Sequence, residues 1–195
     1  LAFDYSGHGL SDGAFEDGTI SAWREDALAA IDTHSTGPIV LVGSSMGGWM
    51  ALLAALARPD RVAGLVLIAP APDFTEKLMW PEFSAEAQSE IMEQGFTQRP
   101  SDYDEPYTIT RALIEDGQTW QILDAPIELD IPVRILQGMQ DADVPWKHAE
   151  RLVDTITSED LVFTLIKDGD HRLSREQDIA RLKTTCAEIA TATRP

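Results

Sequence analysis

The chain has 195 residues, of which 44% are hydrophobic and 25% are charged. That length and composition suit one folded domain with a sizeable core and disfavour intrinsic disorder. Fifteen Lys and Arg stand against 33 Asp and Glu, which gives a formal net charge of −18. Such a charge repels phosphate backbones and anionic membrane surfaces, so nucleic acid is not expected as a partner.

The single cysteine, Cys186, rules out an internal disulfide within this sequence. Its spacing from Ile179, Leu182 and Ile189 predicts the apolar face of a helix, and therefore a core position. A reducing compartment is compatible with this cysteine usage, so the cytoplasm is the expected location, although an oxidising one is not excluded. No apolar run reaches the roughly 18 residues of a membrane span.

The first 34 residues predict a strand end, a loop and a helix. Residues 1–5 are typical of the end of a strand, and residues 6–13 form a glycine-rich loop in which His8 is interpreted as a stabilising polar residue. Between Thr19 and His34, apolar residues recur every three or four positions. This pattern predicts an amphipathic helix capped by Thr19.

A Gly-x-Ser-x-Gly pentapeptide follows an aliphatic run over residues 39–42, with Ser45 at its centre. Residues 46–58 are rich in helix formers and stop at Pro59, which cannot continue a helix. Glycines at both ends of the pentapeptide permit a sharp strand-to-helix turn that exposes the serine hydroxyl. A glycine-rich turn without chemistry is the alternative, but the flanking strand and helix favour Ser45 as a nucleophile.

The next apolar run, residues 62–69, suits a strand buried on both faces. Strands that alternate with helices and are apolar throughout predict a parallel sheet covered on both sides. After residue 70, prolines break the pattern and large apolar side chains appear without alternation. We therefore predict an α/β core from residues 1–70 and 131–195, with a cap or lid insertion over residues 71–130.

Within this insertion we expect short helices over residues 74–80 and 85–94, a turn-rich segment over 101–107 and a longer helix over 108–123. Its large apolar side chains could line an apolar pocket or pack the cap to itself. They are Phe74, Met79, Trp80, Phe83, Phe96, Tyr103 and Trp120. The candidate substrate contacts are Phe74, Trp80 and Trp120 from the cap, together with Trp49 from the helix after Ser45.

The regular pattern returns with strands over residues 133–137 and 161–166 and helices over 146–155 and 175–190. An acidic, turn-forming segment follows each strand. Because ligands of open α/β sheets bind outside the carboxyl ends of the strands, these loops are expected to meet Ser45 there.

His171, in the second loop, is the candidate general base, since imidazole can take the proton of a serine hydroxyl near neutral pH. His148 is interpreted as a solvated residue. Asp141 and Asp143 are both candidates to orient the imidazole, and Asp141 is favoured because it comes three residues after Gly138, early in the loop. The carboxylate without this role is expected to cap the next helix. The backbone N–H of Met46 is the candidate oxyanion donor.

The chain order Ser45, Asp141, His171 is that of α/β-hydrolases, and nearly the whole chain resembles this family. Residues 3–13 resemble the loop after the fourth strand of that fold. Residues 43–49, 138–146 and 170–172 are similar to the abhydrolase-domain subfamily of palmitoyl-protein thioesterases and acyl-glucuronide esterases.

The resemblance implies a mostly parallel sheet with helices on both faces and a helical cap. It also implies hydrolysis of a small-molecule or lipid-acyl ester or thioester through an acyl-serine intermediate, without metal or organic cofactor. A second oxyanion donor would come from the loop after the third strand. By this comparison the chain starts at the fourth strand, so we expect three strands and a helix upstream of Leu1, and a fragment that is poorly stable alone.

Other functions remain open at this point. Triad chemistry fixes acyl transfer but not the leaving group, so a general carboxylesterase or an aminopeptidase of the same fold is an alternative. A ligand-binding module that keeps a hydrolase fold, or a catalytically silent fragment, is the alternative from another class. The oligomeric state is not indicated by any of these patterns.

Overall fold

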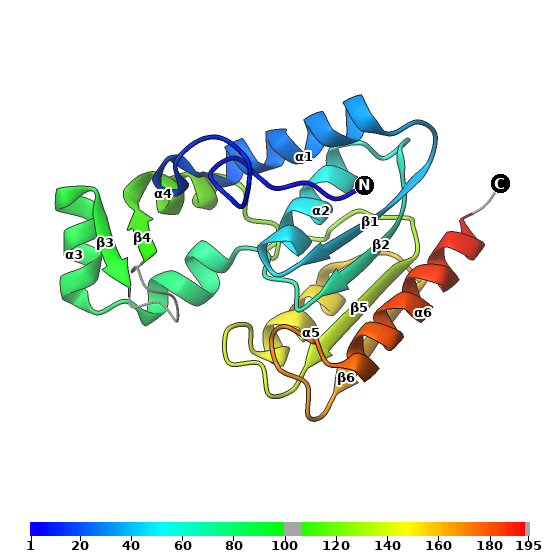
Figure 1. Cartoon of the computed structure of the whole chain (residues 1–195). Helices are drawn as coiled ribbons and strands as arrows, with labels where there is room; N and C mark the ends of the chain where they lie inside the picture. Colours follow the sequence, from blue (N-terminus) through cyan, green and yellow to red (C-terminus); the bar gives the residue numbers. More distant parts are fainter. Residues whose placement is uncertain (100–106, 194–195) are drawn as a thin grey trace. The chain divides into compact units, whose positions relative to one another are not determined.

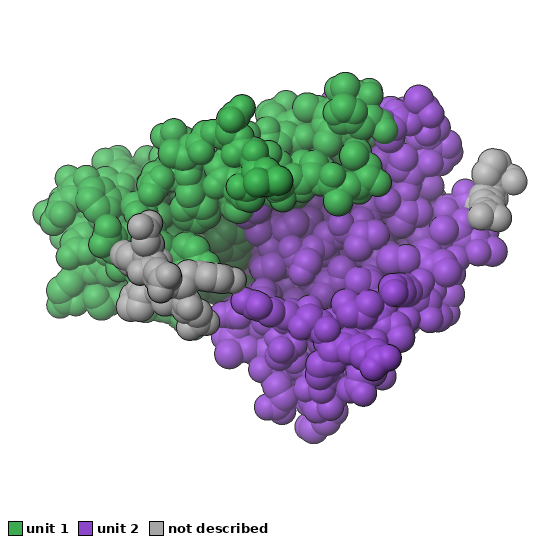
Figure 2. All heavy atoms as spheres, in the orientation of Figure 1, with its two compact units in different colours: residues 1–34, 73–121 green, residues 35–72, 122–195 purple. Residues whose placement is uncertain are grey.

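A computed structural model of the chain describes residues 1–99 and 107–193. The chain forms two compact units, coloured separately in Figure 2. One combines residues 1–34 with 73–121, and the other combines 35–72 with 122–195. The predicted division into a core and a cap over 71–130 stays a proposal. The first compact unit combines most of that cap with residues 1–34, which were assigned to the core.

The second unit is built on a four-stranded parallel sheet (Figure 1). Its strands lie in the order β1-β2-β5-β6, and each neighbouring pair is parallel. The bounds are Ile39–Ser44 for β1, Val62–Ile68 for β2, Val133–Gly138 for β5 and Leu161–Ile166 for β6. All four strands were expected from their apolar runs, and the predicted α/β fold class is confirmed.

Helices cover both faces of this sheet. Helices α2 (Met46–Ala57) and α5 (Trp146–Thr155) pack on one face, where a buried cluster joins them to β2 and β5. It includes Ala51, Leu52, Leu65, Leu67, Ile135 and Leu152. Helix α6 (Glu176–Ala192) lies along the other face (Figure 1). Gly64 faces that side, since it neighbours Leu65 in β2 and successive residues of a strand face opposite sides. Ile189 of α6 packs against it so closely that a Cβ atom at Gly64 would lie 2.7 Å from Ile189 Cγ2.

The first unit contains the remaining elements, which are mostly helical. They are η1 (Phe15–Asp17), α1 (Ile20–His34), η2 (Thr75–Met79), η3 (Trp80–Glu82), α3 (Ala85–Gln94), β3 (Phe96–Arg99), β4 (Tyr107–Thr110) and α4 (Arg111–Thr119). Thr19 caps α1 as predicted, since its Oγ1 accepts a hydrogen bond from Ala22 N at 3.1 Å. Asp116 joins α4 to α1 through both the N–H and the hydroxyl of Ser21.

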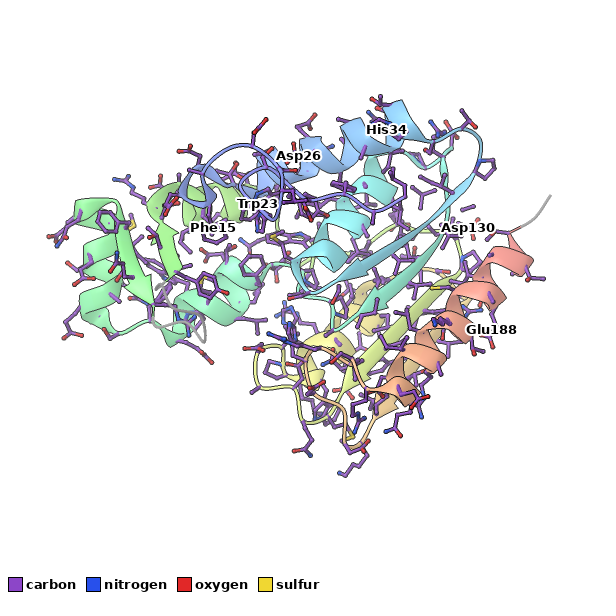
Figure 3. The ribbon with its side chains drawn as sticks, viewed as in Figure 1. Phe15, Trp23, Asp26, His34, Asp130 and Glu188 are labelled. Carbon is purple, nitrogen blue, oxygen red and sulfur yellow. The ribbon has the colours of Figure 1, made fainter. Side chains whose placement is uncertain are left out.

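The loop before α1 is held by aromatic packing. His8 bonds the carbonyl of Ser6 at 3.2 Å, and its ring lies 5.2 Å from that of Trp23, as expected of a loop-stabilising residue. Phe15 also faces Trp23, and both side chains are visible in Figure 3.

Three local predictions were wrong. Residues 1–5 form no strand, because no described strand pairs with them. The helix expected over 108–123 is shorter, since Thr108 and Ile109 belong to β4, which pairs antiparallel with β3. Cys186 is only partly buried and Ile179 is exposed; the buried face of α6 carries Asp178, Thr185 and Ile189 instead.

The turn expected over residues 101–107 lies outside the described residues except for Tyr107, which begins β4. Of the helices that the structure describes, none combines the length and the apolar character that a bilayer crossing demands.

Candidate active site

Ser45 occupies a strained turn between β1 and α2. Its backbone angles are φ 53° and ψ −120°, a region that residues with a side chain rarely adopt. Three backbone hydrogen bonds hold it there: Ser45 N donates to Ile68 O, and Ser45 O accepts from Gly48 N and Ala71 N. The hydroxyl caps no backbone N–H of α2, so it does not serve the helix.

The glycine before this turn has a steric reason. A Cβ atom at Gly43 would collide with the carbonyl oxygen of Gly47 and lie 2.8 Å from Gly48 N. Only glycine therefore allows the strand and helix to approach so closely. Met46 is the first residue of α2, so its N–H has no acceptor within the helix and lies at the positive end of the helix dipole. Such an N–H suits a developing oxyanion.

His171 and Asp141 are hydrogen-bonded to each other. His171 Nδ1 lies 2.8 Å from Asp141 Oδ2, with the Asp141 side chain fully buried and 23% of the His171 side chain exposed. Asp141 Oδ1 accepts the backbone N–H groups of Asp143 and Val144, at 2.9 and 2.8 Å. This leaves Nε2 of His171 as the nitrogen that can take a proton from another group.

The pair shifts the pKa of both partners. Burial raises the pKa of Asp141, but hydrogen bonds from His171 and the N–H of Val144 outweigh it, so the net pKa lies below the ordinary 3.8. The hydrogen bond to Asp141 raises the pKa of His171 above 6.5, against the opposing effect of burial. The charge of Asp143 raises it further, although that carboxylate is exposed.

Strand register brings the three residues to one edge of the sheet. Ser44 pairs with Ile68, Ile68 with Leu136, and Gly138 with Ile166, so the carboxyl ends of the strands are level. Ser45 therefore lies about 10 Å, or two strand spacings, from the end of β5 that leads to Asp141. In the described part of the chain, no hydrogen bond joins Ser45 to His171.

The loop after β6 crosses over the end of β5. Gln140 N donates to Gly169 O at 2.8 Å, and Met139 N donates to Ile166 O at 2.9 Å. A Cβ atom at Gly138 would collide with the carbonyl oxygens of Gly169 and Asp170. The absence of a side chain at Gly138 thus permits the crossing that brings His171 from β6 back towards Asp141.

Two sequence interpretations in this region were wrong. Asp143 does not cap α5, because the cap residue is Pro145 and no side chain bonds to the helix end. His148 is 8% exposed rather than solvated, and its Nε2 lies 2.7 Å from Pro72 O. Its hydrogen-bond partner lies 76 positions away, which no local pattern reveals.

The predicted substrate contacts have different surroundings. Trp49 is fully buried in α2. Trp80 packs with Phe83 against a buried cluster of the first unit, and Trp120 donates its Nε1–H to Ser21 Oγ at 2.7 Å. Phe74 is partly buried just before η2. Packing and hydrogen bonding within the first unit therefore account for Trp80 and Trp120 without a ligand, while Tyr103 lies outside the described residues.

Asp141, Asp143 and His171 also place one potential metal-ligand atom each within 4.8 Å of one another. Their contacts fit a hydrogen-bonded pair better than a metal site. His171 Nδ1 and both oxygens of Asp141 already have partners, so a metal ion would have to displace them.

The chain is similar to known proteins along most of its length. Residues 1–183 match the alpha/beta hydrolase family. The mitochondrial palmitoyl-protein thioesterase ABHD10 of Homo sapiens is 38% identical over 191 residues, which cover 97% of this chain and 62% of that protein. The mouse protein of that name is 39% identical, and 64% of it is covered. The chain thus spans a little under two thirds of the length of these curated relatives.

Two solved structures are similar along most of the chain. A putative hydrolase from Agrobacterium vitis S4 is 48% identical with a TM-score of 0.91, covering 95% of this chain and 74% of that one. Alpha/beta hydrolase domain-containing protein 10 from mouse is 37% identical with a TM-score of 0.88, covering 98% and 77%.

Proposed function

Since this chain belongs to the alpha/beta hydrolase family, we propose that it is a serine hydrolase that cleaves an acyl ester or thioester. The observation that carries the proposal is the His171–Asp141 hydrogen bond, formed at the sheet edge where the strained turn presents Ser45. A strained serine, a carboxylate-bonded imidazole and a helix N-terminus are three of the parts that acyl transfer needs.

In the proposed mechanism, Ser45 Oγ attacks the acyl carbonyl while His171 Nε2 takes its proton. Asp141 keeps the imidazole in the tautomer with a proton on Nδ1 and stabilises the imidazolium that forms. The N–H of Met46 donates to the oxyanion of the tetrahedral intermediate. His171 then gives its proton to the departing alkoxide or thiolate. A water molecule, deprotonated by the same nitrogen, attacks the acyl carbon of the acyl-serine, and His171 returns that proton to Ser45 Oγ as the acid leaves.

The thioester preference rests on the relatives. The human and mouse proteins that this chain resembles are named palmitoyl-protein thioesterases, so a lipid-acyl thioester is the first substrate class to test. A carboxylesterase or aminopeptidase of the same fold is the alternative, because the residues of the substrate pocket, and not the triad, determine which leaving group is accepted.

A fluorophosphonate probe tests the nucleophile, because it reacts covalently with an activated serine. We expect the chain to be labelled, the Ser45→Ala variant to lose both labelling and esterase activity, and Ser44→Ala to keep both. Ser44 is a matched control, since it is the adjacent, exposed serine at the end of β1. A folded protein that the probe never labels would instead support a ligand-binding module. If Ser44→Ala alone loses labelling, the nucleophile is Ser44 and not Ser45.

A further inference from the structure

Gln137 is a fully buried polar side chain near the end of β5, in a strand that is otherwise mostly apolar. Burying an amide costs free energy unless its polar atoms find partners. Its Nε2 group lies within hydrogen-bond distance of three acceptors: Asp141 Oδ2 and Val144 O at 3.0 Å, and Gly138 O at 3.1 Å. Its Oε1 has no hydrogen-bond partner among the described residues.

These contacts span the turn that carries Asp141. Gly138 opens the turn and Val144 closes it, so the amide of Gln137 lies against both ends and against the carboxylate between them. Within the described residues, Gln137 is the only side chain other than His171 that bonds to Asp141. Both donors use the same oxygen, Oδ2, whereas Oδ1 is held by backbone N–H groups.

We propose that Gln137 is a positioning residue of the active site, which fixes Asp141 Oδ2 opposite His171 Nδ1 and shares that oxygen's negative charge. This inference rests on the proposed triad and extends it by one residue. Two features favour it over a purely structural role. Four donors fill the acceptor capacity of the Asp141 carboxylate, and all hydrogen bonds of the Gln137 amide are made by its N–H side while Oε1 stays unbonded.

Loss of the Gln137 donor would change proton transfer at His171. Without the Gln137 donor, the charge on Oδ2 would act on His171 alone and favour the imidazolium more strongly. The pKa of His171 would then rise, and the pH at which it becomes a base would rise with it. A residue that merely held the turn together would affect the folded fraction but not this pH.

The test is kcat/KM against pH for Gln137→Met in the full chain, with Gln140→Met as the matched control. Gln140 is exposed in the same turn, and its side chain makes only one long hydrogen bond, to Lys167 O at 3.5 Å. We expect Gln137→Met to lower the plateau of kcat/KM at high pH about tenfold, because a slightly displaced catalytic group lowers the rate by one to two orders of magnitude. Its acidic limb should move to higher pH, while Gln140→Met matches the parent.

An unshifted acidic limb, with a plateau that is unchanged or falls only with the folded fraction, would overturn the proposal. Gln137→Glu is a second test if the methionine variant folds poorly. The new carboxyl group can donate to Asp141 when protonated but repels it when ionised, so kcat/KM should fall again at high pH. A profile with the parent's shape would count against the role of Gln137.

Failure of this inference can be told apart from failure of the proposed function. If the triad is wrong, Ser45→Ala and Asp141→Asn will stay active. If only the role of Gln137 is wrong, those two variants will be inactive while Gln137→Met keeps the parent's pH profile.

Discussion

His171 interacts with several acidic groups that act on it in different ways. Asp141 is bonded to its Nδ1 and is buried, so it affects both the orientation and the charge of the ring. Asp143 and Asp170 are exposed and act through their charge. All three raise the pKa of His171 above 6.5, and because a general base must be neutral, activity should rise with pH through that elevated value.

This difference predicts unequal effects for two conservative variants. Asp141→Asn should lower kcat/KM by roughly 10⁴-fold, because the amide cannot hold the required tautomer. Asp143→Asn should change the plateau no more than about twofold, since an exposed charge is screened by salt. Its acidic limb should move to lower pH, because one charge that favours the imidazolium is gone. Both profiles come from kcat/KM measured between pH 5 and 9.

If Asp143→Asn is the inactive variant, the orienting carboxylate is Asp143 and the hydrogen bond between His171 and Asp141 is not the catalytic one.

The preference for Asp141 could be predicted from its place early in the loop after β5. Gln137 was missed, although a glutamine at the end of an apolar run was a visible signal. Its meaning depends on the path of the turn over residues 138–144, which residue types alone do not specify.

The loop between β6 and α6 is fastened by ion pairs. Arg175, just before α6, bonds Asp168 at the start of the loop and Asp178 in the first turn of the helix. The Asp178 side chain is fully buried, and its other cation, Arg181, is 3.4 Å away. His171 lies between the two points that Arg175 joins, so this element positions the proposed base.

Arg175→Gln should therefore lower both the midpoint of thermal unfolding and kcat/KM. Removing the cation leaves a buried carboxylate poorly compensated and releases the loop. Arg151→Gln is the matched control, because the Arg151–Asp124 pair is about half exposed and should contribute no more than about 1 kcal/mol. Equal midpoints for the two variants, measured by circular dichroism, would show that the Arg175 pairs hold nothing in place.

Elements with strong apolar patterns could be predicted, and those that depend on distant pairing could not. The helices over residues 85–94 and 146–155 and the strand over 161–166 have the expected bounds. The β3–β4 hairpin was missed because it pairs two short strands across a segment with turn-forming residues. The face of α6 was misjudged because Asp178 is buried by its ion pairs rather than by apolar character.

At the scale of the whole molecule, the chain divides into a sheet unit that carries all three proposed catalytic residues and a mostly helical unit. The helical unit contains most of the proposed cap together with α1, whose Ser21 is bonded to Asp116 of α4. Deleting residues 71–130 would remove the partner of α1, so single substitutions are a better test of the cap than deletion.

We expect Phe74→Ala to lower the ratio of long-chain to short-chain hydrolysis by about tenfold, the usual effect of lost apolar contact with a substrate. Trp80→Ala should leave this ratio unchanged, because the Trp80 side chain packs within the first unit. Neutral p-nitrophenyl esters of both lengths suit the measurement, because a net charge of −18 repels anionic substrates. Trp146→Ala in α5 serves as the control. If Phe74→Ala lowers both rates together and the ratio stays constant, Phe74 does not select the acyl chain.

The strained backbone at Ser45 lowers the stability of the fold at the position where the proposed reaction needs a serine. Glycine adopts φ 53° without strain, and the serine hydroxyl gives α2 no capping bond that glycine would forfeit. Strain of this kind amounts to about 1–3 kcal/mol. A laboratory selection for heat resistance alone would therefore favour Ser45→Gly, and the resulting library would look improved while it lost the proposed nucleophile. Only a selection that also requires catalysis would keep serine at residue 45.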